Sequence, residues 1–134
     1  MVSWSIREAA EKSRLSQHTL RWYERIGLLG HIERRADGQR RFSDGDLDWL
    51  VLLSKLRATG MPIRDMQLYA ELVRSGAREQ ERLDLLQRHR ELVAADLAKR
   101  QESLRLLDSK ISFYQRRVRA AEKEHELDAH DQAG

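Results

Sequence analysis

The distribution of glycine and proline constrains the fold of this chain more than any other feature. Six of its seven glycines and its single proline lie before residue 77, and the next glycine is Gly134. Both residue types favour turns, so the 57 residues between them, rich in Leu, Ala, Glu, Arg and Gln, predict one long helix or two. Because Ser75–Gly76 has the composition of a helix C-cap, we place the main boundary there.

The second segment carries a heptad repeat. With Leu83 at position a, ten of the twelve a and d positions as far as Ala121 are apolar, and Arg90 and Arg100 are the exceptions. These a and d positions form an apolar seam along one side of the helix, and such a seam is buried against another helix. At about 1.5 Å per residue the seam is about 57 Å long, which is more than the small first segment can cover. We therefore expect a homodimer rather than a folded-back hairpin, because no turn residue interrupts the repeat; the repeat alone leaves the orientation of the two helices open. The expected dimer contacts are Leu83, Leu86, Val93, Leu97, Leu104, Leu107, Ile111, Tyr114 and Val118.

The start of the first segment predicts two short helices. Ser5 and Glu8 have the spacing of a capping box, in which each side chain bonds the other residue's backbone amide. Ser16 is the expected N-cap of a second helix that ends at Gly27. Two short helices joined by a tight turn are typical of a helix-turn-helix.

The middle of the first segment predicts a hairpin followed by further helices. Asp37–Gly38 is a strong turn signal between two short extended stretches, because both residues tolerate positive φ. Ser43 is the expected N-cap of the next helix, Gly60 ends it, and Met61–Pro62 begins another. The expected fold class is therefore mainly α, a winged helix-turn-helix followed by a long coiled-coil helix.

The charge is concentrated in the first segment. The chain carries 25 basic and 22 acidic residues, a net charge of +3, and the first 76 residues hold the whole excess. Arg34, Arg35, Arg40 and Arg41 have only Asp37 among them, a density of guanidinium groups that suits phosphate contacts. A solvated charged loop is the alternative interpretation.

Several classes of function are disfavoured by the sequence. It contains no cysteine, which removes disulfides, thiolate metal sites and cysteine nucleophiles. It has no Gly-rich phosphate loop, nucleophile elbow or metal-ligand spacing, so we expect no catalytic residue, metal or cofactor. No apolar stretch approaches membrane length and no signal peptide follows Met1, so we expect no membrane partner and a cytoplasmic location.

Four stretches resemble, in order and spacing, successive motifs of the MerR family of bacterial transcription regulators. The stretches are Ser5–Ala10, Thr19–Leu29, Gly38–Ser43 and Leu56–Met61. The resemblance covers about residues 4 to 74, and Lys110–Tyr114 is similar to part of that family's dimerisation element.

The resemblance implies how the chain acts. It implies a winged helix-turn-helix DNA-binding domain at residues 4–76, a coiled-coil dimerisation helix at 77–122 and a short tail at 123–134. Two chains in an antiparallel coiled coil would place two DNA-binding domains on a pseudo-palindromic promoter site. The dimer would distort the DNA so that RNA polymerase holoenzyme engages both promoter elements. Activation and repression are not separated by the sequence.

The resemblance also implies which residues contact DNA. They are Gln17, His18, Thr19, Arg21, Trp22, Tyr23, Arg40, Arg41 and Arg57. The first three would face base edges, Arg21 would reach a base or a phosphate, and the Tyr23 hydroxyl and the remaining arginines would contact phosphates. Arg14 departs from the family at a turn where glycine is frequent, and a left-handed conformation would cost it about 1 kcal/mol.

Two points stay open. Only 13 residues follow Ala121, which leaves no room for the separate ligand domain of larger family members, so the existence and identity of a small-molecule effector are unknown. Any such ligand would lie between the long helix and the DNA-binding part, near Trp49, Tyr69 and the tail. We otherwise expect these two aromatic residues in the core or an interface. The alternative function is a coiled-coil adaptor whose winged helix contacts protein instead of DNA.

Overall fold

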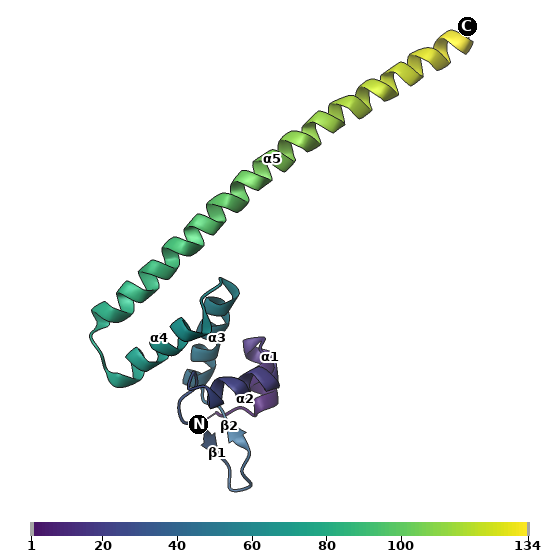
Figure 1. Cartoon of the computed structure of the whole chain (residues 1–134). Helices are drawn as coiled ribbons and strands as arrows, with labels where there is room; N and C mark the ends of the chain where they lie inside the picture. Colours follow the sequence, from purple (N-terminus) through teal and green to yellow (C-terminus); the bar gives the residue numbers. More distant parts are fainter. Residues whose placement is uncertain (1, 134) are drawn as a thin grey trace. The chain divides into compact units, whose positions relative to one another are not determined.

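The computed structural model describes residues 2–133 and is mainly helical (Figure 1). Its elements in chain order are α1 (Ile6–Ser13), α2 (Gln17–Arg25), β1 (Glu33–Arg34), β2 (Arg40–Arg41), α3 (Asp44–Ala58), α4 (Ile63–Ser75) and α5 (Glu79–Ala133). The predicted fold class is confirmed, and the glycine-free stretch forms one helix rather than two.

The helices begin where the sequence predicts. At α1, the Ser5 hydroxyl accepts a hydrogen bond from the Glu8 amide and the Glu8 carboxylate accepts one from the Ser5 amide. Ser16 caps α2, and Ser43 caps α3 in a second capping box. These bonds satisfy amide groups that have no partner within the helix, which fixes the helix starts locally.

Two helices end in a left-handed residue. Gly76 follows α4 with φ +68°, as the C-cap prediction requires. Arg14 follows α1 with φ 62°, and it is the one non-glycine residue with positive φ in the part of the chain that the structure describes. The predicted strain at the α1–α2 turn is therefore present.

The wing is a short antiparallel hairpin. Glu33 pairs with Arg41 and Arg34 with Arg40, and Gly38 lies in the turn with φ +86°. The backbone of Trp4 exchanges two hydrogen bonds of 2.8 Å with Phe42, so the N-terminal segment extends this pairing beyond β2. The hairpin is thus attached to the helices at its base.

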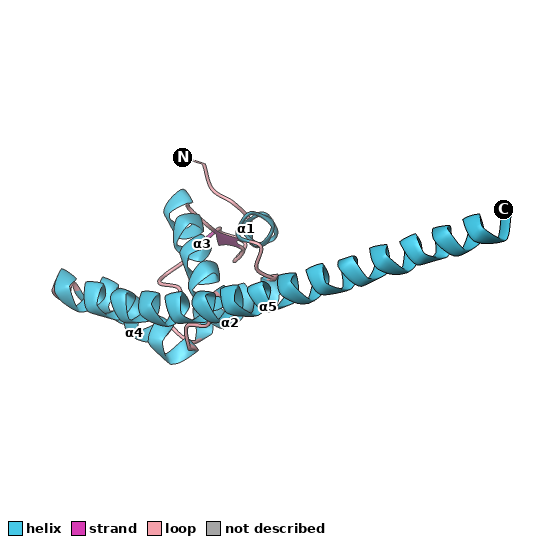
Figure 2. Ribbon diagram, turned by 90° about the horizontal axis from the view of Figure 1, so that it is seen from above, coloured by secondary structure: helices cyan, strands magenta, loops and turns pink. Residues whose placement is uncertain are grey.

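One hydrophobic core joins these elements. Its buried residues are Ala9, Leu20, Tyr23, Leu28, Leu29, Ile32, Phe42, Leu50, Leu53, Leu56, Met61, Met66, Ala70 and Leu85. Helix α1 packs against α2 and α3, and α3 packs against α4. Figure 2 shows α1 beside α3. Trp49 stacks on Tyr69 with ring centroids 5.6 Å apart, and its indole Nε1 donates to the Leu28 carbonyl at 2.8 Å, so both aromatic residues serve the packing of the core.

The chain divides into two compact units at Val93. We call residues 2–93 the head and residues 94–133 the arm. The first turns of α5 belong to the head, where Leu85 is buried in the core. Residues 123–133, predicted as part of a separate tail, continue α5, and residue 134 lies outside the described residues. Within residues 2–133 no helix is both long enough and apolar enough to cross a membrane.

Candidate nucleic-acid interface

The front of α2 is ordered by its N-cap. The Ser16 hydroxyl accepts from the Thr19 amide at 3.0 Å and donates to Thr19 Oγ1 at 2.9 Å. Arg21 is exposed one turn further on, and its Nη2 donates to Gln17 Oε1 at 3.4 Å. His18 is exposed beside them. Gln17 and Arg21 therefore share one helix face, as their four-residue spacing requires.

Trp22 and Tyr23 differ in burial although they are adjacent. Trp22 is 37% exposed, whereas Tyr23 is 2% exposed and belongs to the core. Burial raises the pKa of the Tyr23 hydroxyl above its ordinary value of 10.0, and the nearby Arg57 guanidinium opposes that shift. At neutral pH the phenol keeps its proton, so the hydroxyl remains a hydrogen-bond donor.

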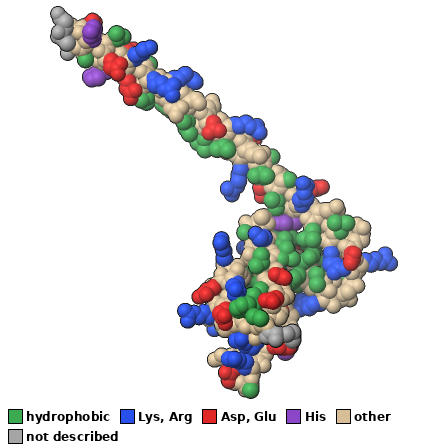
Figure 3. Space-filling model, turned by 180° about the vertical axis from the view of Figure 1, so that it is seen from behind, with side chains coloured by type: hydrophobic (Ala, Val, Ile, Leu, Met, Phe, Trp, Pro, Cys, Tyr) green, Lys and Arg blue, Asp and Glu red, His purple; other side chains and the backbone are tan. Residues whose placement is uncertain are grey.

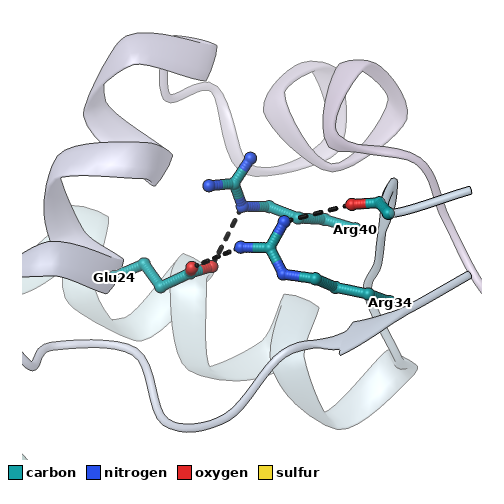
Figure 4. A network of polar contacts seen from close by, with 4 residues as sticks. Glu24, Arg34 and Arg40 are labelled. Atoms are coloured by element: carbon teal, nitrogen blue, oxygen red, sulfur yellow. Dashed lines mark hydrogen bonds and ion pairs between the residues drawn. The ribbon is translucent and has the colours of Figure 1, made fainter.

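A carboxylate connects α2 to the wing (Figure 4). Glu24 Oε1 accepts from Arg34 Nη2 at 3.0 Å, and Glu24 Oε2 accepts from Arg40 Nε at 3.1 Å. Arg34 Nη1 also donates to the Gly38 carbonyl at 3.1 Å, which ties the same guanidinium to the wing turn. One acidic side chain thus joins both strands of the wing to the second helix.

Arg41 has different partners from Arg40. Its Nε donates to the Ser3 hydroxyl at 3.0 Å and its Nη2 to the Ser3 carbonyl at 2.9 Å. Successive side chains of a strand point to opposite faces. The structure therefore does not bring these two arginines together on one surface, although the resemblance implies phosphate contacts for both.

Arg57 lies at the end of α3. It is exposed, and its Nη1 donates to the Met61 carbonyl at 3.3 Å, which steadies the turn before α4. Its positive charge lowers the pKa of the Tyr23 hydroxyl and so opposes the effect of burial. A phosphate oxygen can accept hydrogen bonds from both kinds of group.

Two residues that hold the wing arginines, Glu24 and Ser3, were not among the residues predicted from the sequence. Glu24 is separated from Arg34 by 10 residues and from Arg40 by 16, and Ser3 is separated from Arg41 by 38. The two-residue period of a strand could have assigned Arg40 and Arg41 to opposite faces. No local pattern identifies Glu24 or Ser3 as their partners.

The predicted seam on α5 changes along its length. Leu86 packs against the core and Val93 is half-buried, both within the head. From Leu97 to Val118 every predicted seam residue is exposed by 53% to 59%. Figure 3 shows apolar side chains along this helix between charged ones. Leu107, Ile111, Tyr114 and Val118 line one shallow apolar groove on the arm.

Within the described residues no three His, Cys, Asp or Glu side chains are placed to hold one ion. Hydrogen-bond donors and cations lie on α2, in the wing and at the end of α3. A helix-turn-helix with an attached wing of this kind defines the winged helix-turn-helix class of DNA-binding proteins.

Comparison with known proteins identifies the family. The model of the MerR HTH family regulatory proteins matches residues 4–72. An HTH-type transcriptional regulator of Haemophilus influenzae is 39% identical over 116 residues, which cover 86% of each chain. The chain belongs to the MerR family and is a DNA-binding transcription regulator.

Solved structures agree with this assignment. HiNmlR, described as a MerR family regulator lacking the sensor domain and bound to promoter DNA, is 38% identical with a TM-score of 0.76, over 86% of this chain and 92% of its own. A MerR family transcriptional regulator of Listeria monocytogenes is 37% identical with a TM-score of 0.84, over 92% of this chain and 95% of its own.

Proposed function

We propose that the protein binds a pseudo-palindromic promoter site as a homodimer and controls transcription initiation by distorting the promoter DNA. The observation that carries the proposal is the exposed apolar seam of the arm on the same chain as a winged helix-turn-helix. The similar protein HiNmlR is described as bound to promoter DNA, which supports the choice of ligand. Binding to chromosomal DNA requires a cytoplasmic location.

The arm supports the homodimer. Its seam repeats at heptad spacing from Leu97 to Val118, and water surrounds it in a single chain. Burying an apolar seam of this kind against a second copy is the ordinary driving force of a coiled coil. An antiparallel pair would carry one head at each end, and two identical heads related by a two-fold axis match a pseudo-palindromic site.

The head supports sequence recognition. His18 and Arg21 are exposed at the front half of α2, with Gln17 and Thr19 beside them. These side chains are the candidates for base-edge contacts, since only such contacts specify sequence directly. Arg40, Arg57, Trp22 and the Tyr23 hydroxyl are the candidates for phosphate contacts, which fix the position of the head on the duplex.

Distortion of the DNA supplies the regulatory step. Bending or untwisting a promoter costs on the order of a few kcal/mol, and phosphate contacts from two heads can offset it. The distorted site would present both promoter elements to RNA polymerase holoenzyme. No covalent chemistry is needed from any residue.

Titration of the promoter of its own operon tests the proposal. We expect the wild-type protein to bind that promoter at physiological salt at least about a thousandfold more tightly than unrelated DNA. Arg21→Ala should weaken binding to the promoter about tenfold or more. Lys123→Ala, an exposed change on the arm outside the seam, is the control and should bind as the wild type does. Equal affinity for promoter and unrelated DNA would refute the proposal.

A further inference from the structure

The wing brings two positively charged side chains together beside α2. Arg34 and Arg40 are directly opposite each other in the β1–β2 pairing. Two like charges at such a position repel, which destabilises a hairpin. The strands here are two residues each, so the hairpin has few backbone bonds with which to resist that repulsion. A third group is required to hold the two guanidinium groups side by side.

Glu24 meets that requirement. Each of its two carboxylate oxygens accepts a hydrogen bond from a different arginine, at 3.0 and 3.1 Å. The side chains of Glu24 and Arg40 are 25% and 22% exposed, so this pair is partly shielded from water. Charge-assisted bonds in such surroundings fix orientation better than bonds between freely exposed side chains.

The bond to Arg40 uses one particular nitrogen. It is formed through Nε, and the two terminal nitrogens of that guanidinium have no hydrogen-bond partner among the described residues (Figure 4). A guanidinium held at Nε keeps its fork of terminal donors for a second acceptor. Arg41 is held instead by Ser3 on the other face of the strand.

We propose that Glu24 is a positioning residue for DNA binding: it fixes the wing to α2 through Arg34 and Arg40, and so presents the terminal nitrogens of Arg40 to a backbone phosphate. The inference rests on the proposed function, because it assigns Arg40 rather than Arg41 as the wing's main phosphate contact. Glu24 itself touches no DNA in this arrangement.

The proposal predicts an effect opposite in sign to simple electrostatics. A carboxylate close to a DNA-binding surface repels phosphates, so its removal should strengthen binding if charge alone matters. If Glu24 positions Arg40, its removal should weaken binding although the protein becomes more positive. The direction of the change therefore decides between the two.

The test compares Glu24→Gln with Glu33→Gln in titrations of the promoter at several salt concentrations. Glu33 lies in β1, is exposed, and has no ion pair among the described residues, so the two variants lose the same charge in the same region. We expect Glu24→Gln to bind about tenfold more weakly with a salt slope shallower by about one. Glu33→Gln should bind equally well or more tightly. Glu24→Gln that binds as tightly as Glu33→Gln would overturn the inference.

A double-mutant cycle shows whether Glu24 acts through Arg40. Arg40→Ala should weaken promoter binding about tenfold in the wild type and less than about twofold in the Glu24→Gln background. An equal loss in both backgrounds would contradict the positioning role. Thermal unfolding of the head should change little in Glu24→Gln, since partly exposed ion pairs contribute about 1 kcal/mol or less each.

Two results separate this inference from the proposed function. If the wild-type protein does not distinguish the promoter from unrelated DNA, both the proposed function and this inference are wrong. If the wild-type protein does distinguish them and Glu24→Gln binds as the wild type does, the inference alone is wrong and the proposed function stands.

Discussion

The head buries many of its apolar side chains within one chain, whereas the arm leaves its apolar side chains exposed. In the head, Phe42 and Leu50 are fully buried by residues of the same chain. In the arm, every residue from Ala94 to Asp131 is exposed, although Leu104 and Ile111 are as apolar as any core residue. A single chain can form the hydrogen bonds of a long helix, but it cannot bury a seam on that helix without a second helix. The difference leads us to expect that the arm, and not the head, pairs with a second chain.

The two phenylalanines of the chain give the strongest test of this difference. Phe42 is 0% exposed in the head and Phe113 is 40% exposed on the arm. Phe42→Ala should lower the free energy of unfolding of the head by about 3–5 kcal/mol, because it removes buried surface and leaves a cavity. Phe113→Ala should change it by less than about 0.5 kcal/mol. Urea denaturation of both variants measures the contrast, and similar losses would show that the head and the arm unfold as one unit.

A charge placed in the seam of the arm should weaken the dimer and leave the head folded. Ile111→Asp should raise the dissociation constant of the dimer by about a hundredfold or more, since a carboxylate cannot be buried unpaired in a coiled coil. The thermal transition of the head should persist, because Ile111 lies outside its core. Lys123→Asp, off the seam, is the control. Sedimentation equilibrium measures the dimer, and a stable Ile111→Asp dimer would refute the predicted seam.

Local features of the fold were predictable from the sequence because their causes are local. Ser5, Ser16 and Ser43 cap helices whose free amides lie within three residues of them. Gly76 ends α4 because it adopts the left-handed conformation without a steric penalty. The family resemblance agreed with the comparisons for the same reason, since its motifs are short and ordered along the chain.

Contacts between distant residues were not predictable in the same way. The heptad assignment gave Leu85 no role, yet it is the one buried residue of α5 between residues 79 and 131, because the core of the head extends to the first turns of that helix. Glu24 carried no signal in the sequence, because its partners are brought to it only when the wing folds against α2. Seven-residue periodicity describes one face of one helix and contains no information on tertiary contacts made by other faces.

The two left-handed C-caps allow a smaller test within the head. Arg14→Gly should stabilise the head by about 0.5–1 kcal/mol, because relief of positive φ outweighs the greater freedom of glycine in the unfolded chain. Gly76→Ala should destabilise it by about 1 kcal/mol through strain alone, since beyond the adjoining residues no atom lies within 4 Å of the added Cβ. Thermal unfolding measures both. If both substitutions stabilise the head, or both destabilise it, then side-chain contacts and not backbone conformation control these two turns.

The smallest expected effect is a pH dependence confined to the head. The hydrogen bond from the Ser5 backbone amide, followed by that from the Ser5 hydroxyl, lowers the pKa of Glu8 below its ordinary value of 4.5. A carboxyl whose pKa is lower in the folded state contributes stability above its unfolded pKa and loses that contribution as the pH falls through the folded pKa.

The transition of the head should therefore move to lower temperature as the pH falls below about 4.5, and Glu8→Gln should make this part of the slope shallower. Glu11→Gln, which removes a carboxylate from an exposed ion pair with Arg7 on the same helix but outside the capping box, is the matched control. Because the Glu8 side chain is exposed, solvent screens the bond and the effect is small, so scanning calorimetry across closely spaced pH values is the suitable measurement. Parallel slopes for the wild type and Glu8→Gln would show that the capping box forms in the structure without contributing to the acid sensitivity of the head.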